Sequence, residues 1–365
     1  MMGISKVIDE AVSFIHSNEQ SKKGIAEKLL PLKGKKISFP SKELLEELLV
    51  FPVHGKPLEG KIAGVDSGFV DKKLASVDLV LIRAVGVLFE YEKGFFRKSS
   101  YVPGLYSFPM PHLSNHALEL DEFACSKSLL RLREEVSTAR EVIEKFSPEY
   151  CFLDGSIVPQ YQDKPRKDSV INELYHSIVR EFEDLFETAE KNKCILVGCV
   201  EDSRGSRFRS VLQEEVLQHE KLLPSEKLDY LFDSALLDYL LSVGERTCAL
   251  HYTKNISQHP ILNDFDEKWS KNIFSFYLKP SLYDRPLRVE FINGAGNLTE
   301  KSSKIASVVF SLSSLHREYA FPSVLIEADL RARLRPEEID VVVNKIMDKV
   351  AKNVKMKLRR DSRPF

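Results

Sequence analysis

Three acidic residues stand where their side chains could share divalent cations. Asp66 ends the apolar run 62–65, Asp154 ends a second apolar run at 150–153, and Glu135 lies between them in a stretch with helical periodicity. Carboxylates are the hard oxygen donors that Mg²⁺ and Mn²⁺ prefer. Two such ions about 3.5–4 Å apart can activate water and stabilise a leaving oxygen. The three acids therefore predict metal-assisted phosphodiester chemistry.

Each acid taken alone has a simpler explanation. Asp66 precedes Ser67-Gly68 and Asp154 precedes Gly155-Ser156, so either aspartate could merely begin a turn. Glu135 borders an apolar stripe and could be a solvated boundary residue. That stripe consists of Leu132, Val136, Ala139, Ile143 and Phe146. The order of strand, helix and strand in one chain favours a shared site, and it resembles the arrangement in RNase H-like nucleases.

Composition sets the limits of the function. The chain has 365 residues, 43% hydrophobic content, 53 Lys and Arg and 54 Asp and Glu, with a net charge of −1. Any surface for nucleic acid must therefore be local. Five cysteines without a CxxC pair indicate buried free thiols in a reducing cytoplasm and argue against structural zinc.

No membrane association is expected. Residues 1–18 mix Lys6, Asp9 and Glu10 into an amphipathic helical pattern, unlike a signal peptide. The longest apolar stretch, 77–89, is interrupted by charges and is too short to span a bilayer. The apolar face of the first helix is expected to pack in the core, with a dimer or partner contact as the alternative. That face consists of Val7, Ala11, Phe14 and Ile15.

No Pro-, Gly- or Ser-rich linker divides the chain, so the predicted strands and helices favour one compact α/β domain with a mixed sheet flanked by helices. Its parts are an N-terminal helical extension at 1–58, a core at 59–333 and a basic C-terminal helix at 334–365. We expect a helix to begin at Ser41, a loop at 103–115, and a long helix at 116–146. The expected strands are 61–66, 77–92, 95–102, 150–154, 194–200, 247–253, 273–278 and 286–293. Further helices are expected at 168–192, within 201–246, at 300–318 and at 336–358.

Two basic segments are candidate surfaces for DNA. In the loop 203–209, Arg204, Arg207 and Arg209 are predicted to contact phosphates, with Phe208 available to stack on a base. A solvated helix start is an equal alternative. The tail 345–360 has basic residues on a helical pattern, which favours a packed helix with a solvated basic face over a DNA or partner surface. The glycine-rich stretch 293–297 lacks GxGxxG spacing and predicts a turn without a nucleotide site.

Taken in order, the short motifs resemble the NurA family of nucleases, which work with the HerA hexameric translocase in DNA end resection. The resemblance covers about residues 60–333. Its markers are Gly64-Val65-Asp66-Ser67-Gly68, the helix 130–141 with Glu135, Leu153-Asp154-Gly155-Ser156, Leu196-Val197-Gly198, Gly244-Glu245-Arg246-Thr247, Leu287-Arg288-Val289-Glu290-Phe291, and Phe321-Pro322 leading to Leu325-Ile326-Glu327-Ala328-Asp329.

The resemblance implies an RNase H-like core with additional N-terminal, inserted and C-terminal helices. It also implies two Mn²⁺ or Mg²⁺ ions, a homodimer, and a HerA-like hexameric ATPase as partner. The implied activity is 5′-to-3′ exonuclease action on DNA with endonuclease action on single strands. Asp66, Glu135 and Asp154 match the family's metal-binding acids.

Two positions depart from the family pattern. Asp329 stands where the family usually has His, and it is the predicted fourth metal ligand, with Glu290 and Glu327 as alternatives. Glu201 stands where the family often has Lys, and Arg204 or Arg207 is the candidate to replace that cation. A catalytically weakened adaptor that binds DNA or an ATPase is therefore the alternative function. An RNA-processing nuclease of the same fold is a third.

Overall fold

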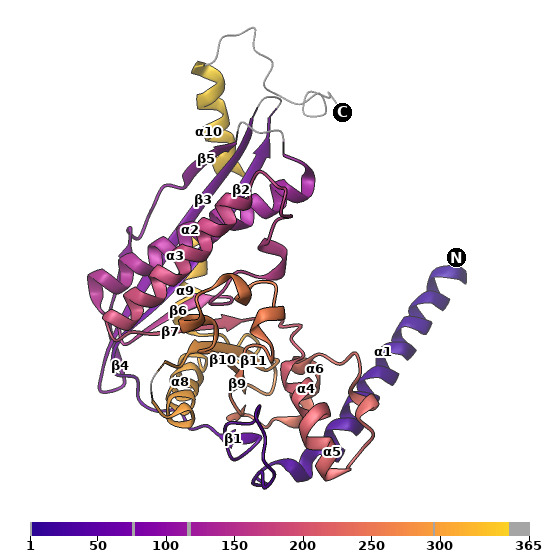
Figure 1. Cartoon of the computed structure of the whole chain (residues 1–365). Helices are drawn as coiled ribbons and strands as arrows, with labels where there is room; N and C mark the ends of the chain where they lie inside the picture. Colours follow the sequence, from indigo (N-terminus) through magenta and orange to yellow (C-terminus); the bar gives the residue numbers. More distant parts are fainter. Residues whose placement is uncertain (1, 75–76, 115–117, 295, 350–365) are drawn as a thin grey trace. The chain divides into compact units, whose positions relative to one another are not determined.

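The computed structural model describes residues 2–74, 77–114, 118–294 and 296–349 (Figure 1). The chain divides into two compact units, each assembled from three separate stretches of sequence. Unit 1 contains Met1–Lys56, Cys199–Ile256 and Lys271–Pro322. Unit 2 contains Pro57–Gly198, Ser257–Ser270 and Ser323–Phe365.

Unit 2 is built on a mixed sheet with strand order β7-β6-β2-β3-β4. β2 (Gly60–Lys73), β3 (Asp78–Glu92) and β4 (Phe95–Val102) form an antiparallel meander. β6 (Tyr150–Asp154) runs parallel to β2, and β5 (Met110–Ser114) pairs with β3. β7 is Ile195–Val200, and the unit boundary follows its Gly198. The parallel pair requires a crossover, which the long helix between β4 and β6 provides.

Two sets of helices cover opposite faces of this sheet (Figure 1). α2 (Leu120–Phe146) packs on one face. Its close approach is seen at Gly86 of β3, where an added Cβ would lie only 2.2 Å from the Val142 side chain. α9 (Ser323–Ala332) packs on the other, because a Cβ at Gly64 of β2 would lie 2.9 Å from the Val324 carbonyl oxygen. Val65 pairs with Gly86, so neighbouring residues of β2 face α9 and α2 in alternation.

The remaining elements of unit 2 are short, apart from α3 (Asn172–Lys191), which packs against α2, and α10 (Pro336–Lys349). The buried side of α10, Ile339 and Val343, packs on Leu79 and Leu81 of β3. The short helices are η2 (Tyr161–Asp163), η6 (Leu262–Asp264) and α7 (Glu267–Ser270). One more, η5 (Ile256–Gln258), spans a unit boundary.

Unit 1 contains an antiparallel strand run in the order β1-β8-β10-β11. These strands are β1 (Val50–Pro52), β8 (Glu245–Thr247), β10 (Ile273–Lys279) and β11 (Leu287–Ile292), and β9 (Leu250–His251) also pairs with β10. The helices are α1 (Met2–Leu29), η1 (Leu30–Leu32), α4 (Arg207–Val211), a π-helical turn η3 (Leu212–Val216), α5 (Leu217–Glu220), η4 (Ser225–Leu228), α6 (Asp233–Leu240) and α8 (Leu298–Leu312).

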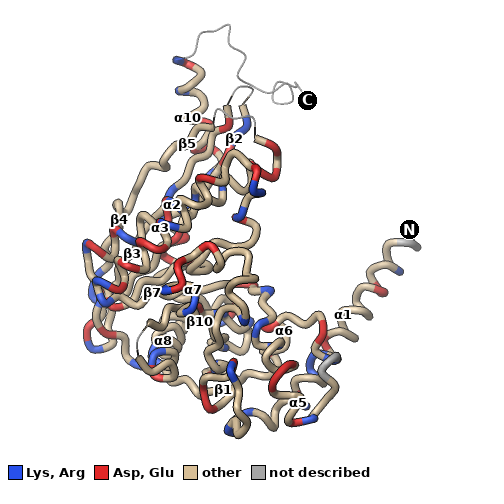
Figure 2. The backbone as a smooth tube through the Cα atoms, viewed as in Figure 1, with Lys and Arg blue, Asp and Glu red and all other residues tan. Residues whose placement is uncertain are grey.

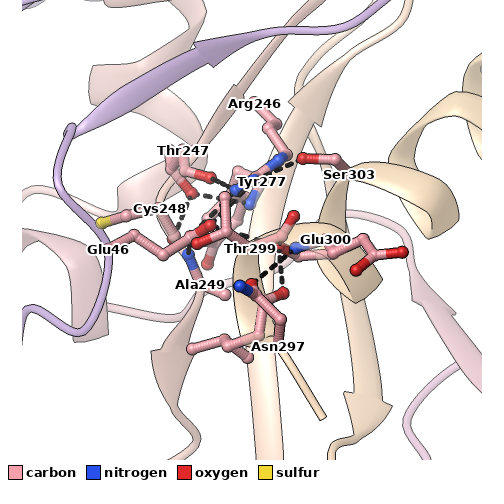
Figure 3. Close-up of polar contacts among 12 residues, drawn as sticks. Glu46, Arg246, Thr247, Cys248, Ala249, Tyr277, Asn297, Thr299, Glu300 and Ser303 are labelled. Carbon is pink, nitrogen blue, oxygen red and sulfur yellow. Dashed lines mark hydrogen bonds and ion pairs between the residues drawn. The ribbon is translucent and has the colours of Figure 1, made fainter.

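A buried ion pair lies in unit 1 (Figure 3). The Arg246 guanidinium donates to both carboxylate oxygens of Glu46, at 2.8 and 3.0 Å, and both side chains are fully buried. The same guanidinium donates to Ser303 Oγ at 2.9 Å, and the Ala249 N–H donates to Glu46. The fold tolerates these buried charges because each has several hydrogen-bond partners.

Most of the expected strands are confirmed, but the strand expected at 247–253 is replaced by β8 and the two-residue β9. Three further local expectations are wrong. No helix begins at Ser41, whose Oγ instead accepts the N–H groups of Glu43 and Leu44 in a local turn. The expected loop 103–115 contains strand β5. The expected apolar face of the first helix does not pack in the core, because Val7, Phe14 and Ile15 are 64%, 68% and 57% exposed, and α1 contributes to the core only through its last turns.

Charge and cysteine placement agree with the composition. Acidic and basic residues are interspersed along the described chain (Figure 2). All five cysteines are buried and free, as expected. Within the described residues, no helix is long and apolar enough to cross a membrane. The basic tail prediction falls largely on residues 350–360, which lie outside the described part of the chain.

Candidate functional site

Asp66 and Asp154 occupy matching positions on neighbouring parallel strands. Val65 of β2 is aligned with Leu153 of β6, and each aspartate is the next residue on its strand. Parallel strands lie about 4.8 Å apart, and aligned residues point to the same face. Since Asp66 shares its face with Gly64 and Gly68, which abut α9, both aspartates lie on the α9 side of the sheet.

The environment of Asp66 disfavours a lone negative charge. Its side chain is buried, with 8% exposure. Burial is the main cause that raises the pKa of Asp66 to about 7, and the carboxylates of Glu135 and Asp329 raise it further. The Ser67 N–H and the Arg131 guanidinium oppose this shift. Acidic groups close enough to repel one another are a suitable setting for a cation.

Glu135 is held from the opposite side of β2. Its Oε2 accepts hydrogen bonds from Ser67 Oγ at 2.6 Å and from Arg131 Nη1 at 2.8 Å. Ser67 follows Asp66 and therefore points to the α2 face. Burial raises the pKa of Glu135, while Arg131 and Ser67 act to lower it. This carboxylate was expected near the carboxyl end of the first core strand. It contacts Ser67 in the middle of β2, because that strand runs on to Lys73 and does not end at residue 66 as expected.

The three candidates for a fourth ligand have different surroundings. Asp329 is exposed on α9 and is close enough to Asp66 to raise its pKa. Glu327, also on α9, accepts hydrogen bonds of 2.8 Å from Tyr101 Oη and from Arg331 Nε. Glu290 belongs to unit 1, where it pairs with Arg288 at 2.7 Å. Of the three, Asp329 alone exerts a resolved effect on Asp66.

The donor set suits a hard divalent cation, but the side chains do not form a closed cage. Asp66, Asp154, Asp329 and Glu135 offer only oxygen atoms, which matches Mg²⁺ or Mn²⁺. Within the described ranges, no three acidic, His or Cys side chains converge tightly enough to hold an ion. Arg131 contributes to this lack of convergence, because its guanidinium is paired with the carboxylate of Glu135.

The predicted basic loop is partly committed to internal contacts in unit 1. Arg207 pairs with Glu43, and Arg209 donates to Gln213 and to the Leu228 carbonyl. Arg204 is exposed. Phe208 is 2% exposed within a hydrophobic cluster, so the expectation that it is available to stack on a base is wrong. Glu201 accepts a hydrogen bond from Tyr319 Oη.

Sequence reasoning missed the partners of Glu135. Arg131 precedes Glu135 by four residues, the spacing at which helical side chains meet, and this could have identified the ion pair. Ser67 was visible only as part of a turn signal. Its contact with Glu135 spans 68 positions of sequence and depends on how α2 packs on β2.

Comparisons with known proteins agree with this architecture. The family model described as "NurA domain" matches residues 60–334. The NurA nuclease from Sulfolobus solfataricus superposes with a TM-score of 0.52 at 14% identity, covering 96% of this chain and 98% of that one. This likeness confirms the expected α/β RNase H-like fold.

Two further structures are more distant. NurA bound to dAMP and manganese gives a TM-score of 0.44 at 12% identity, covering 96% of this chain and 97% of that one. Human ENDOV gives a TM-score of 0.34 at 16% identity, covering 78% of this chain and 86% of that one. No curated protein matches the sequence.

Proposed function

The chain belongs to the NurA family of nucleases, and we propose that it is a metal-dependent deoxyribonuclease. In this proposal it degrades DNA from 5′ to 3′, cuts single strands, and acts in DNA end resection with a HerA-type translocase. The observation that carries the nuclease proposal is the placement of Asp66 and Asp154 at matching positions of two parallel strands. The raised pKa of Asp66 supports it, because Glu135 and Asp329 both contribute to that shift.

Each acid has a distinct part in the proposed site. Asp66 and Asp154 hold the metal ions from the sheet, and Asp329 adds an oxygen donor from α9. Glu135 joins them when its carboxylate leaves Arg131. Bound Mn²⁺ or Mg²⁺ would activate water and stabilise the leaving oxygen. Arg204, and Arg207 and Arg209 if they leave their internal partners, are proposed to contact DNA phosphates.

A cleavage assay tests the proposal. Purified protein should degrade linear DNA in Mn²⁺ and leave it intact in EDTA. Asp66→Asn and Asp154→Asn should each abolish cleavage, because each removes a charged metal ligand. Glu144→Gln is the matched control, since Glu144 is an exposed acid on α2. Activity that survives Asp154→Asn would refute this site, and parallel RNA substrates decide the sugar preference.

The quaternary proposals concern a homodimer and a HerA-like ATPase in the cytoplasm. The exposed apolar residues of α1 support a protein contact, because large exposed apolar surfaces commonly mark interfaces. Five buried free thiols suit a reducing compartment. Val7→Asp with Phe14→Asp should convert a dimer to a monomer in light scattering, if α1 forms the interface. A wild-type monomer would exclude the homodimer.

One observation favours a second function, that of a weakened adaptor that binds DNA or an ATPase without cutting. Glu135 is occupied by Arg131, and the acids in the described residues do not converge on one point. An adaptor would bind DNA but leave it intact in Mn²⁺. The same cleavage assay therefore separates the two functions.

A further inference from the structure

Unit 2 contains a cavity of about 660 Å³ whose lining is rich in arginine. Four arginines line it, namely Arg83, Arg331, Arg333 and Arg335. Glu338 is the one acidic residue in the lining, so the formal charge of the lining is 4 − 1 = +3. A cavity of this charge attracts anions, in a chain whose net charge is −1.

Two of the four arginines, Arg83 and Arg331, are held by contacts within the protein. Arg83 donates to the carbonyl oxygens of Ser107 and Arg333, at 2.8 and 3.0 Å, and pairs with Glu338. Although partial burial opposes ionisation, hydrogen bonds from the Arg335 N–H and from Arg83 lower the pKa of Glu338. Arg331 is paired with Glu327 at 2.8 Å. Both guanidinium groups are therefore already paired with acids of the protein, and the positive charge left for a ligand comes from Arg333 and Arg335.

The other two arginines of the lining are available to a ligand. Arg333 and Arg335 lie between α9 and α10 and are exposed. Among the described residues, neither guanidinium makes a hydrogen bond or an ion pair. Ser107 also lines the cavity. Its hydroxyl oxygen is buried and has no hydrogen-bond partner among the residues that the structure describes. Two unpaired cations and one unsatisfied hydroxyl suit phosphate oxygens.

The cavity adjoins the acidic site along β2. Arg83 is paired with Gly68, which follows Asp66 by two residues on the same face. That spacing is about 7 Å along a strand. A Cβ at Gly68 would lie 3.5 Å from the Cα of Arg333, so the chain that carries the free arginines passes directly beside β2. A phosphate in the cavity would thus lie close to the acids.

An exposed aromatic residue completes the lining. Tyr106 lines the cavity and is 87% exposed, and Phe108, two residues on, is 98% exposed. Exposed rings beside cationic side chains are the usual means of binding unpaired nucleotides, because a base in a duplex has no free face. The combination distinguishes a nucleic-acid strand from a free inorganic anion.

We propose that this cavity binds an unpaired DNA strand, with Arg333 and Arg335 on its phosphates and Tyr106 stacked on a base. The bound strand passes its adjoining phosphodiester to Asp66, Asp154 and Asp329. This inference rests on the proposed nuclease function, and it specifies which DNA form the site takes and from where. It places the primary contacts on unit 2 and not on the loop 203–209.

Binding is measured by fluorescence anisotropy with a labelled oligo-dT in EDTA, so that cleavage plays no part. Arg333→Ala with Arg335→Ala should weaken binding at least tenfold and reduce the salt slope by about 1.4, or about 0.7 for each lost phosphate contact. Arg97→Ala with Lys98→Ala is the control, since it removes two exposed charges from β4 of the same unit. The control should keep nearly wild-type affinity.

Tyr106 has its own readout. Tyr106→Ala should weaken oligo-dT binding at least fivefold without changing the salt slope, because stacking releases no counterions. Tyr106→Phe should restore binding, and blunt duplex binding should be unchanged by either variant. If the double-alanine variant is unstable in thermal melting, the Arg333→Gln and Arg335→Gln pair carries the same test.

The outcomes separate this proposal from the nuclease proposal. Wild-type protein that cuts DNA while the arginine pair binds oligo-dT as tightly as wild type would overturn the cavity assignment alone. Equal losses in the Arg97 and Lys98 control would also overturn it. Arginine-dependent binding without cleavage in Mn²⁺ would support the cavity and refute the nuclease.

Discussion

The Arg131 guanidinium lies 2.8 Å from Glu135 Oε2, one helical turn away on α2. The same guanidinium lies 3.3 Å from Ser67 Oγ, which itself donates to Glu135. Arg131 thus supplies positive charge to a buried acid that the proposed function assigns to metal. Arginine and metal ion would compete for one carboxylate, so the ion pair sets how readily the site takes up metal.

Arg131→Gln should therefore strengthen Mn²⁺ binding, by about tenfold if the ion pair contributes about 1.4 kcal/mol. Without metal the variant should be less stable, by about 1–3 kcal/mol, because Glu135 loses a charged partner. Mn²⁺ titration calorimetry and urea unfolding in EDTA measure the two effects. Arg140→Gln removes an exposed pair from the same helix and should change neither. Weaker Mn²⁺ binding in Arg131→Gln would show that Arg131 positions Glu135 for the metal.

Asp66 predicts a pH dependence of stability in metal-free protein. Its folded pKa of about 7 lies above the unfolded value near 3.8. The folded state therefore retains a proton that the unfolded state has lost, and stability falls as the pH rises through this window. The fall from pH 4 to pH 8 should be on the order of 2–4 kcal/mol.

Denaturant unfolding in EDTA across this pH range measures the effect. Asp66→Asn should flatten the profile, because the amide does not ionise, and should be more stable than wild type at pH 8. Addition of Mn²⁺ at pH 8 should stabilise wild type and not the variant. An equally steep profile in Asp66→Asn would assign the titration to another group.

The buried pair of Glu46 and Arg246 should dominate the stability of unit 1. Glu46→Gln leaves the Arg246 charge buried without its counterion and should cost about 3–5 kcal/mol in chemical unfolding. Glu46→Gln combined with Arg246→Met should be less destabilised than the sum of the single variants. Glu47→Gln, next in sequence and exposed, should have no measurable effect. Additive losses would mean that the two side chains are not coupled.

Gly68 should be intolerant of a side chain for reasons of space. A Cβ there would lie 2.8 Å from the Ala332 carbonyl oxygen at the end of α9. Gly68→Ala should push α9 away from β2, destabilise the protein by about 1–3 kcal/mol, and weaken oligo-dT binding by displacing Arg333. Gly104→Ala, where a Cβ meets nothing within 4 Å, is the control for unfolding and binding. Wild-type stability in Gly68→Ala would show that α9 can shift without cost.

The strand and helix framework was predictable where local patterns are strong. The strand 150–154 was predicted with its observed bounds, and the helix 116–146 corresponds to α2. β5 was missed because Pro109 and Pro111 suggested a loop. Proline is tolerated in an edge strand, and β5 pairs with β3 alone. The helix expected at Ser41 failed because its hydroxyl caps a turn that does not continue as a helix.

The positions of the candidate acids on their strands were predictable, and the contacts that surround them were not. Asp66 and Asp154 follow from apolar runs that end in an acid, a purely local signal. The contact of Ser67 with Glu135 and the cavity around Arg333 depend on how α2 and α9 pack on opposite faces of β2. The exposure of the apolar residues in the first turns of α1 could not be predicted either. An amphipathic pattern identifies an apolar face but does not show what covers it.

The interleaved course of the chain has a consequence for synthesis on the ribosome. Unit 1 needs residues up to Pro322, and unit 2 needs α9, which starts at Ser323. Neither unit can therefore close before residue 322 has been synthesised, unlike a chain whose domains fold one after another. The α9 face of β2, including Asp66, stays uncovered until residues 323–332 have been synthesised. Early release or a late frameshift would leave two incomplete bodies prone to aggregation, and no intact half.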